Sequence, residues 1–172
     1  MEYYYTMEYL PVRYNGTAEQ IANRKAVWNF KDGNASSSII SELAADVRKI
    51  AGYDKSNYVI CFVPASTRWK TTRRYADVAR QLQLMTGVTA TLSAITKPQD
   101  GEAGHISGKT SDPASEFRFS SECFRGKNVI LVDDVVTRGR TLSSTGARLI
   151  SMGANSVTGL VVAKTVNPDW AA

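Results

Sequence analysis

Two short apolar runs without polar interruption stand out along the chain. They are YVICFV, residues 58–63, and NVILV, residues 128–132. A continuous Val/Ile/Leu run of this length is typical of a buried strand in a parallel sheet, because helices cover both faces of such a sheet. Residues 156–163 form a third run of the same character. The pattern therefore predicts three buried strands.

Elsewhere apolar residues recur at spacings of three and four, the period of an amphipathic helix. These stripes predict helices over residues 36–52, from 71 or 72 to 86, and over 140–152. Thr17 and Gln20 form a capping-box pattern, which predicts a further helix over residues 18–28. Weaker patterns predict one or two edge strands within residues 1–14, a strand over 88–95 and a ribbon around 116–120.

The order of these elements is that of an α/β fold. Strand, helix, strand, long loop, strand, helix and strand predict right-handed crossovers and a mainly parallel, twisted sheet with helices on both faces, a Rossmann-like core. No repeat or linker divides the 172 residues, so we expect one domain spanning 1–172. Residues 96–127 lack an apolar pattern of their own, and a loop of that length is usually functional or disordered.

Composition and charge indicate the cellular compartment of the protein and the kind of ligand it could bind. Cys61 and Cys123 have no metal-binding spacing, which indicates reduced cysteines. No apolar run reaches the length of a membrane span and no leader pattern is recognisable, so we expect a cytoplasmic protein without a membrane partner. The net charge of +5 fits anionic ligands. The basic residues are scattered, however, so a solvated surface explains them equally well.

Candidate chemistry follows the strand over residues 128–132. Asp133 and Asp134 come at its carboxyl end, where open α/β sheets bind ligands. Thr137, Gly139 and Thr141 then lead into a predicted helix, whose first N–H groups and dipole favour a phosphate. Carboxylates for hydroxyls or a metal, followed by an anion cradle, predict a site for ribose 5-phosphate. The structural alternative is a buried strand with a capping loop that happens to carry two acids.

The segment VILVDDVVTRGRT, residues 129–141, resembles the ribose-phosphate signature of the type I phosphoribosyltransferases. Further segments are similar to the ComF-like, competence-associated branch. CFVPASTRWKTTRRY, residues 61–75, has that branch's strand, Val-Pro, basic loop and basic-aromatic step, with Arg74 where Gly is usual. NFKDG, residues 29–33, is similar to its Lys-containing turn. The resemblance covers residues 29–163, and the cysteine-rich zinc module that this branch often carries is not among the 172 residues.

The resemblance implies phosphoribosyl diphosphate as substrate, Mg²⁺ as cofactor and a glycosyltransferase reaction at the anomeric carbon, within nucleotide metabolism. Asp133 and Asp134 would bind the ribose hydroxyls or the metal, directly or through water, and Lys109 would be a catalytic residue of the lid formed by residues 97–120. The 5-phosphate would be held by Val135, Val136, Thr137, Arg138, Gly139, Arg140 and Thr141. The diphosphate would be held by Ala65, Ser66, Arg68 and Lys70.

The base end of the implied site is less defined. Lys164 and Trp170 would contact a nitrogen base or nucleotide, with residues 1–28 and 164–172 forming a hood; simple packing of Trp170 is the competing interpretation. His105, the single histidine, is better explained as a solvated loop residue than as a catalyst. Lys97 and Arg118 are further lid candidates. A homodimer is compatible with the family.

Two further functions stay open from the sequence. A non-catalytic protein of this fold, binding phosphoribosyl diphosphate or a nucleotide, would regulate or assist DNA handling. The basic charge allows a nucleic-acid partner, although no nucleic-acid motif indicates one. A diphosphate hydrolase is a third hypothesis, but Asp133 and Asp134 are the single acidic pair that would serve it.

Overall fold

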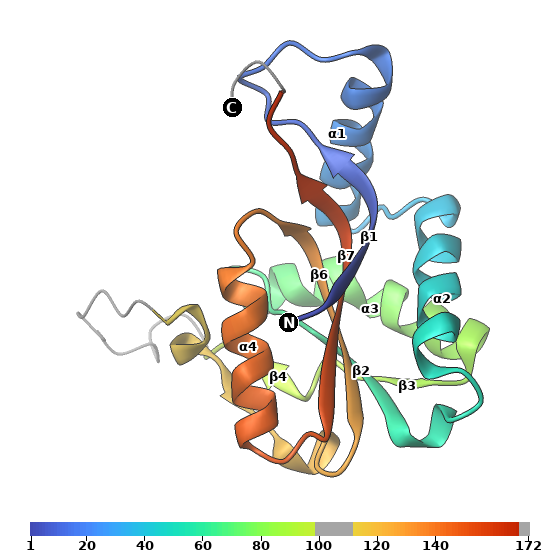
Figure 1. Ribbon diagram of the computed structural model, residues 1–172, viewed down its shortest axis with the longest axis vertical. Helices are drawn as coiled ribbons and strands as arrows, with labels where there is room; N and C mark the ends of the chain where they lie inside the picture. Colours follow the sequence, from blue (N-terminus) through green and yellow to red (C-terminus); the bar gives the residue numbers. More distant parts are fainter. Residues whose placement is uncertain (99–111, 169–172) are drawn as a thin grey trace.

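The computed structural model describes residues 1–98 and 112–168 and contains a five-stranded sheet in the order β1-β7-β6-β2-β3 (Figure 1). All four neighbouring pairs are parallel. The strands are β1 (Tyr3–Tyr9), β2 (Tyr58–Phe62), β3 (Thr89–Ala90), β6 (Asn128–Val136) and β7 (Ser156–Thr165). The α/β class with a parallel sheet is therefore confirmed.

Helices cover both faces of this sheet. Helices α1 (Ala18–Lys31), α2 (Ser37–Ala51) and α3 (Arg68–Thr86) pack on one face, and α4 (Arg140–Ser151) packs on the other (Figure 1). Single 3-10 turns are η1 (Lys55–Asn57), η2 (Pro113–Glu116) and η3 (Ser121–Cys123). The capping box between Thr17 and Gln20 is present at the start of α1. Of the described helices, none has the length and apolar character needed to cross a membrane.

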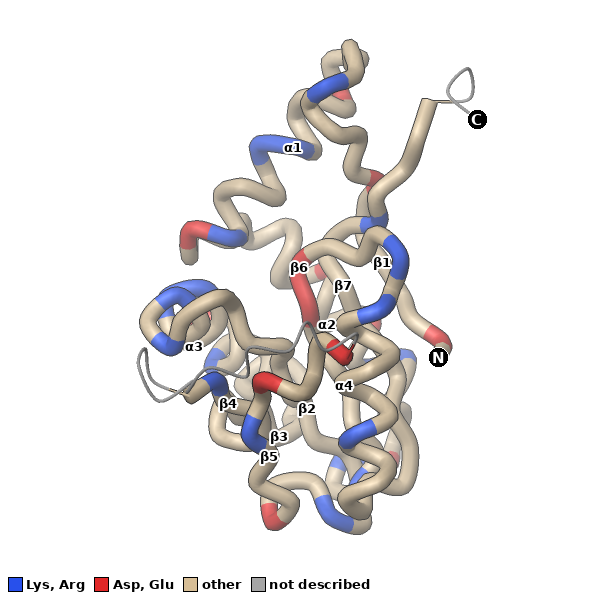
Figure 2. Tube along the Cα trace, turned by 90° about the vertical axis from the view of Figure 1, so that its left-hand side faces the viewer, with Lys and Arg blue, Asp and Glu red and all other residues tan. Residues whose placement is uncertain are grey.

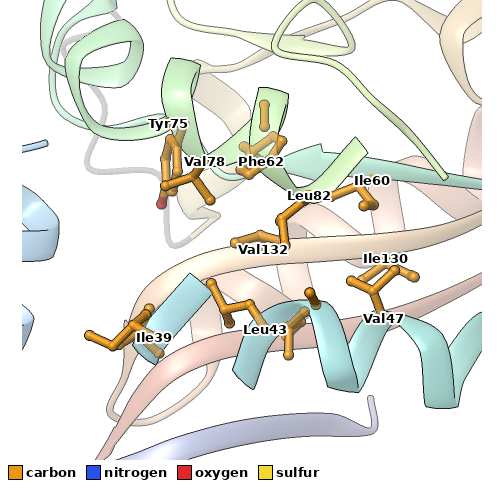
Figure 3. Close-up of a cluster of buried hydrophobic side chains, with 14 of the residues drawn as sticks. Ile39, Leu43, Val47, Ile60, Phe62, Tyr75, Val78, Leu82, Ile130 and Val132 are labelled. Atoms are coloured by element: carbon orange, nitrogen blue, oxygen red, sulfur yellow. The ribbon is translucent and has the colours of Figure 1, made fainter. Parts of the chain in front are cut away.

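The core has one apolar cluster on each face of the sheet. Even-numbered residues of β6, such as Ile130 and Val132, contact Leu43 of α2 and Leu82 of α3 in the first cluster (Figure 3). Val129 and Leu131, which alternate with them, belong to the second cluster with α4. Because successive strand residues point to opposite faces, one uninterrupted apolar run serves both clusters.

The register of β6 leaves its carboxyl end open on one side. Strand β2 ends with Phe62 opposite Val132, whereas β7 continues to pair with β6 as far as Val136. The chain runs outward from β2 through α3 to β3, and in the opposite direction from β6 through α4 to β7. The strand order therefore reverses between β2 and β6, and ligands of open α/β sheets bind at such a reversal.

The expected strand over 88–95 is wrong. Only Thr89–Ala90 joins the main sheet as β3, and Ile95–Thr96 forms β4, which pairs antiparallel with β5 (Arg118–Phe119) in a separate ribbon. The ribbon expected around 116–120 is confirmed. Thr and Val favour extended backbone in general. However, Val88 is buried in the first cluster and Ala94 in the second, and the segment is therefore divided between two sheets.

The turn between α1 and α2 depends on a glycine. Gly33 has φ +85°, and a Cβ there would meet the backbone carbonyl oxygen of Arg73. Gly33→Ala is expected to lower the free energy of unfolding by about 1–3 kcal/mol or more, because backbone strain and the steric contact add. Urea unfolding measures the change.

Gly52 is a matched control for this prediction. It also has a positive φ, +55°, but a Cβ there would meet nothing within 4 Å. Gly52→Ala should therefore show the conformational penalty alone and lose less stability than Gly33→Ala. Equal losses in the two variants would contradict the close approach of the α1–α2 turn to α3.

Candidate active site

The loop between β6 and α4 forms a pocket at the carboxyl end of the sheet. The pocket has a volume of about 280 Å³ and is lined by Asp133, Val135, Val136, Thr137, Arg138, Gly139, Arg140, Thr141 and Leu142. Gly139 has φ +74°, a conformation that glycine adopts without strain, and it is the N-cap of α4. The first N–H groups of α4 are thereby directed towards the loop, as anion binding requires. The structure thus brings together all seven residues expected around a 5-phosphate.

Two threonines join this loop to the neighbouring strand. The hydroxyl oxygens of Thr137 and Thr165 are 2.8 Å apart, a hydrogen-bonding distance. Thr165 ends β7, whose pairing with β6 continues to Val136. The bond holds the loop against the end of β7 in a fixed position.

Asp133 is the acid of the pair that lines the pocket. Burial raises the pKa of its carboxyl well above the usual range, and the adjacent charge of Asp134 raises it further. Its Oδ1 accepts a hydrogen bond from the backbone N–H of Asp134 at 2.8 Å. The carboxyl therefore lies beside the phosphate loop in surroundings that favour a compensating cation or hydroxyl groups.

Asp134 is directed to the other face of the sheet. Its Oδ2 lies 3.0 Å from a guanidinium nitrogen of Arg74 in α3 and 3.6 Å from the ammonium of Lys31 at the end of α1. The side chains of Arg74 and Asp134 are only 14% and 13% exposed. The acidic stretch of β6 and the basic start of α3 can be followed in Figure 2. The two expected acids thus have different partners, and only one of them lines the pocket.

A buried tyrosine lies beneath both acids. Within the described part of the chain, no group forms a hydrogen bond of ordinary geometry with the hydroxyl of Tyr75. Its ring packs against Phe62 at 4.9 Å between centroids (Figure 3). Burial raises the pKa of Tyr75 well above its usual value, and the charges of Asp133 and Asp134 add to the effect. Tyr75 is therefore a neutral phenol at the base of the site.

The expected diphosphate loop is shorter than the sequence indicated, because α3 begins at Arg68 and not at 71 or 72. Thr67 caps the helix by accepting a hydrogen bond from the N–H of Lys70 at 3.1 Å. The N–H of Ala65 donates to the hydroxyl of Thr71 at 2.9 Å, which fixes the loop. Only two described cations, Arg68 and Lys97, line the small pocket of about 90 Å³ beside this helix start.

The other three residues expected to hold the diphosphate do not line this pocket. Ala65 is buried in the turn, and Ser66 and Lys70 do not line the small pocket beside α3. Lys97 pairs with Glu116 at 3.3 Å. Thr71 was missed by the sequence analysis, because a threonine inside a helix is usually a core or surface residue. Its position four residues after the Thr67 cap was the available signal.

The expected base-binding residues are only partly described. Lys164 lies in β7 with its ammonium 5.7 Å from the centre of the Tyr5 ring, and it does not line the phosphate pocket. Lys109, Trp170 and His105 lie outside the described residues. A pocket of about 390 Å³ that the sequence did not reveal adjoins the phosphate loop; its lining residues are Tyr9, Pro11, Arg13, Thr137, Arg138, Thr165 and Asn167.

The side chains that could act as ligands determine which metal this site can hold. Within residues 1–98 and 112–168 no three His, Cys, Asp or Glu side chains lie together as a metal cluster. A zinc-type or two-metal centre of protein ligands is therefore not formed by this part of the chain. One hard carboxylate beside an anion cradle fits Mg²⁺, which keeps several waters and binds through few carboxylates plus substrate phosphates.

Comparison with known proteins gives the family. The Phosphoribosyl transferase domain model matches residues 70–167, more than half of the 172-residue chain. No curated protein matches the chain. A solved hypoxanthine-guanine phosphoribosyltransferase (hpt-2) of Bacillus anthracis is 12% identical, with a TM-score of 0.50 over 80% of this chain and 68% of that chain.

Other solved structures match less well. The hypoxanthine phosphoribosyl transferase of Trypanosoma cruzi is 16% identical, with a TM-score of 0.47 over 85% of this chain and 76% of that one. The hypoxanthine phosphoribosyltransferase of Staphylococcus aureus is 15% identical, with a TM-score of 0.46 over 83% of this chain and 76% of that one. At such identities a structural likeness concerns the fold alone, and the family rests on the matched model. The chain belongs to the phosphoribosyl transferase domain family.

Proposed function

We propose that this protein is an Mg²⁺-dependent phosphoribosyltransferase that binds phosphoribosyl diphosphate and transfers ribose 5-phosphate to a nitrogen base, or catalyses the reverse reaction. The observation that carries the proposal is the shared pocket of Asp133 and the loop 137–141 at the reversal of strand order. A carboxylate for the sugar and N–H groups for its phosphate are thereby fixed next to each other.

The reaction would be a displacement at the anomeric carbon. A nitrogen lone pair of the base forms the new bond to that carbon, while the bond to the diphosphate oxygen breaks and its electron pair leaves with the diphosphate. Positive charge develops on the ribose ring, and the carboxylate of Asp133 would stabilise it. When bound, Mg²⁺ neutralises charge on the diphosphate, and Asp133 would hold it directly or through water.

Asp134 takes a supporting role in this proposal. Its ion pairs with Arg74 and Lys31 join the end of β6 to α3 and α1. A direct contact of Asp134 with ribose or metal, as the resemblance implies, requires exchange of these partners. We therefore assign the sugar contact first to Asp133.

The leaving diphosphate would be bound at the start of α3. The turn of Ala65 and Ser66 together with the cations Arg68 and Lys70 provides our candidates, since the helix dipole and the basic side chains both favour an anion. Lys97 lines the same small pocket as Arg68 and is a further candidate. Lys109, outside the described residues, stays a proposed lid residue.

The base would bind near the ends of β1 and β7. Lys164 and Trp170 stay proposed contacts, although Trp170 lies outside the described residues. Helix α1 lies beside the ends of these two strands (Figure 1), which supports a hood over a single domain of residues 1–172 with its core at about 29–163. A cytoplasmic location and a homodimer complete the proposal.

The ComF-like branch is supported by contacts between the segments that suggested it. The turn NFKDG, residues 29–33, packs on α3, where the guanidinium of Arg73 donates to the carbonyl of Asp32 at 2.9 Å. Lys31 of the same turn and Arg74 of α3 both contact Asp134. The two segments thus meet at the second acid of the signature. We propose membership of this branch on that basis.

Release of diphosphate tests the proposed activity. Protein, phosphoribosyl diphosphate and Mg²⁺ are mixed with a panel of purine, pyrimidine and pyridine bases, and diphosphate is measured by a coupled assay. We expect release that depends on base and on Mg²⁺. Silence across the panel, while calorimetry shows bound phosphoribosyl diphosphate, would overturn the transferase and leave a binding protein.

The start of α3 favours one alternative function, a regulatory protein of this fold that handles DNA. Trp69 is 65% exposed, and the Arg73 guanidinium lies 5.1 Å from the centre of its ring. Exposed aromatic rings among cations are typical of single-strand binding. Salt-sensitive binding of single-stranded DNA that Trp69→Ala weakens, without diphosphate release, would establish this alternative. No DNA binding at low salt would exclude it.

A further inference from the structure

The pocket beside the phosphate loop adjoins the proposed ribose-phosphate site. Thr137 and Arg138 line both pockets, so an occupant of the second lies next to the ligand of the first. The second pocket, which we call the Arg13 pocket, is bounded also by Tyr9 and Asn167 and has a volume of about 390 Å³. This size accommodates a single heterocyclic ring with substituents and water.

The charge of the Arg13 pocket is one-sided. Arg13 and Arg138 both line it, and among the residues that the structure describes no acidic side chain does. A guanidinium presents parallel N–H donors that match the two oxygens of a carboxylate. The Arg13 guanidinium lies 4.8 Å from the centre of the Tyr14 ring. With two arginines in it, the lining is complementary to a negatively charged ligand group.

The loop that carries Arg13 is held by a buried cation. Arg24 of α1 is 8% exposed, and its guanidinium donates to the carbonyls of Leu10 at 2.6 Å, Pro11 at 3.0 Å and Tyr14 at 2.7 Å. Burying a guanidinium is costly unless its N–H groups are satisfied, and here three carbonyls of one loop satisfy them. The loop is therefore fixed before any ligand arrives.

The opposite wall is fixed by β1 and β7. The backbone N–H of Val166 donates to the carbonyl of Tyr9 at 2.9 Å, and the indole N–H of Trp28 donates to the Tyr9 hydroxyl at 3.3 Å. The Thr137–Thr165 bond ties the same wall to the phosphate loop. Tyr9 thus offers a positioned aromatic side chain beside Asn167, whose amide both donates and accepts.

We propose that the Arg13 pocket is the acceptor site and that the acceptor is a nitrogen heterocycle bearing a carboxylate, which Arg13 and Arg138 recognise. This inference rests on the proposed transferase function and names its substrate class. A preformed aromatic wall and an amide suit the ring, and two guanidinium groups suit the carboxylate. Neutral purine and pyrimidine bases offer those guanidinium groups no carboxylate to bind.

The test compares probes that differ only in charge. Nicotinate against nicotinamide and orotate against uracil are titrated by calorimetry into protein loaded with phosphoribosyl diphosphate and Mg²⁺. We expect the carboxylate member of at least one pair to bind about tenfold or more tightly than its neutral partner. Equal affinities within both pairs, or binding of none of the four while phosphoribosyl diphosphate is bound, would overturn the proposal.

Variants assign the preference to the pocket. Arg13→Gln should reduce carboxylate binding about tenfold and leave the neutral probes unchanged, while Arg13→Lys should retain part of the preference. Arg138→Gln should lower the ratio of carboxylate to neutral affinity about tenfold at saturating phosphoribosyl diphosphate. Arg125→Gln is the matched control, because Arg125 is exposed and hydrogen-bonded to Ser121, remote from the pocket. A preference that survives both pocket variants contradicts the assignment.

The outcomes separate this inference from the proposed function. Failure of phosphoribosyl diphosphate to bind at all would overturn the proposed transferase together with its acceptor site. Normal binding of phosphoribosyl diphosphate and transfer to a neutral base would support the transferase and overturn only the carboxylate-bearing acceptor.

Discussion

Replacing Asp133 with Asn is expected to lower kcat/KM for phosphoribosyl diphosphate by about 100- to 1000-fold, the usual cost of removing one preorganised electrostatic group. Asp133 is the acid that lines the phosphate pocket, so the loss falls on the charge that develops in the transition state. The amide oxygen of Asn still accepts the 2.8 Å bond from the Asp134 N–H, and the strand end should keep its shape. Steady-state kinetics of diphosphate release measure the effect.

The same variant should fold more stably than the natural protein. Burial and the charge of Asp134 raise the pKa of Asp133 in the folded state, so folding favours the protonated carboxyl. The resulting stability is fully present below the unfolded pKa of about 4 and is lost as pH rises through the higher folded pKa. Asp133→Asn does not titrate, and its advantage should therefore grow from about pH 4 upwards.

Urea unfolding of the metal-free protein at pH 5 and pH 8 checks this dependence. A variant that is both inactive and more stable cannot owe its inactivity to misfolding. Activity within tenfold of the natural protein would contradict the role given to Asp133. A stability difference that is the same at both pH values would contradict the raised pKa.

The elements that the sequence predicted well are those in which local pattern and tertiary environment agree. The run over residues 128–132 is apolar on both faces because α2 and α3 cover one side and α4 covers the other. The signature after it is contiguous, and residues 137–139 lead directly into α4, which begins at Arg140. A contiguous motif carries its geometry with it, so its residues could be named in advance.

Features formed by distant segments were not predictable in this way. Asp133 and Asp134 are equivalent in the sequence pattern. In the structure they differ because strand residues alternate between the faces of the sheet and because Arg74 forms an ion pair with Asp134. The Arg13 pocket joins the loop after β1 to the end of β7, more than 120 residues later in the chain. No periodicity or spacing encodes such a contact, because it depends on the parallel pairing of β1 with β7.

Helix starts were also misjudged where the pattern is polar. Arg68, Trp69 and Lys70 give no apolar stripe, so α3 was expected to begin later than it does. The Thr67 cap, which bonds the N–H of Lys70, was the signal that would have corrected this. As a result, the cations near the proposed diphosphate site are carried by a rigid helix and not by a loop.

Arg74→Met is expected to lower the free energy of unfolding by about 3 kcal/mol, because it leaves Asp134 as a largely buried charge with weak compensation. The Arg74–Asp134 contact is 3.0 Å with both side chains less than 15% exposed, whereas Lys31 is 3.6 Å away and 43% exposed. Lys31 is therefore a poor substitute for the lost partner. Urea or thermal unfolding measures the loss.

Two further variants make this prediction specific. Arg73→Met is the matched control, since Arg73 is the neighbouring arginine of α3, is exposed, and bonds only the Asp32 carbonyl and the Trp69 ring among the contacts described. It should cost much less than Arg74→Met. The double variant Arg74→Met/Asp134→Asn should recover most of the lost stability, because the unpaired charge is removed with its partner. If the double variant is no more stable than Arg74→Met, the loss comes from packing of the Arg74 side chain and not from the buried charge, and the assignment of Asp134 as the ionic link between β6 and α3 fails.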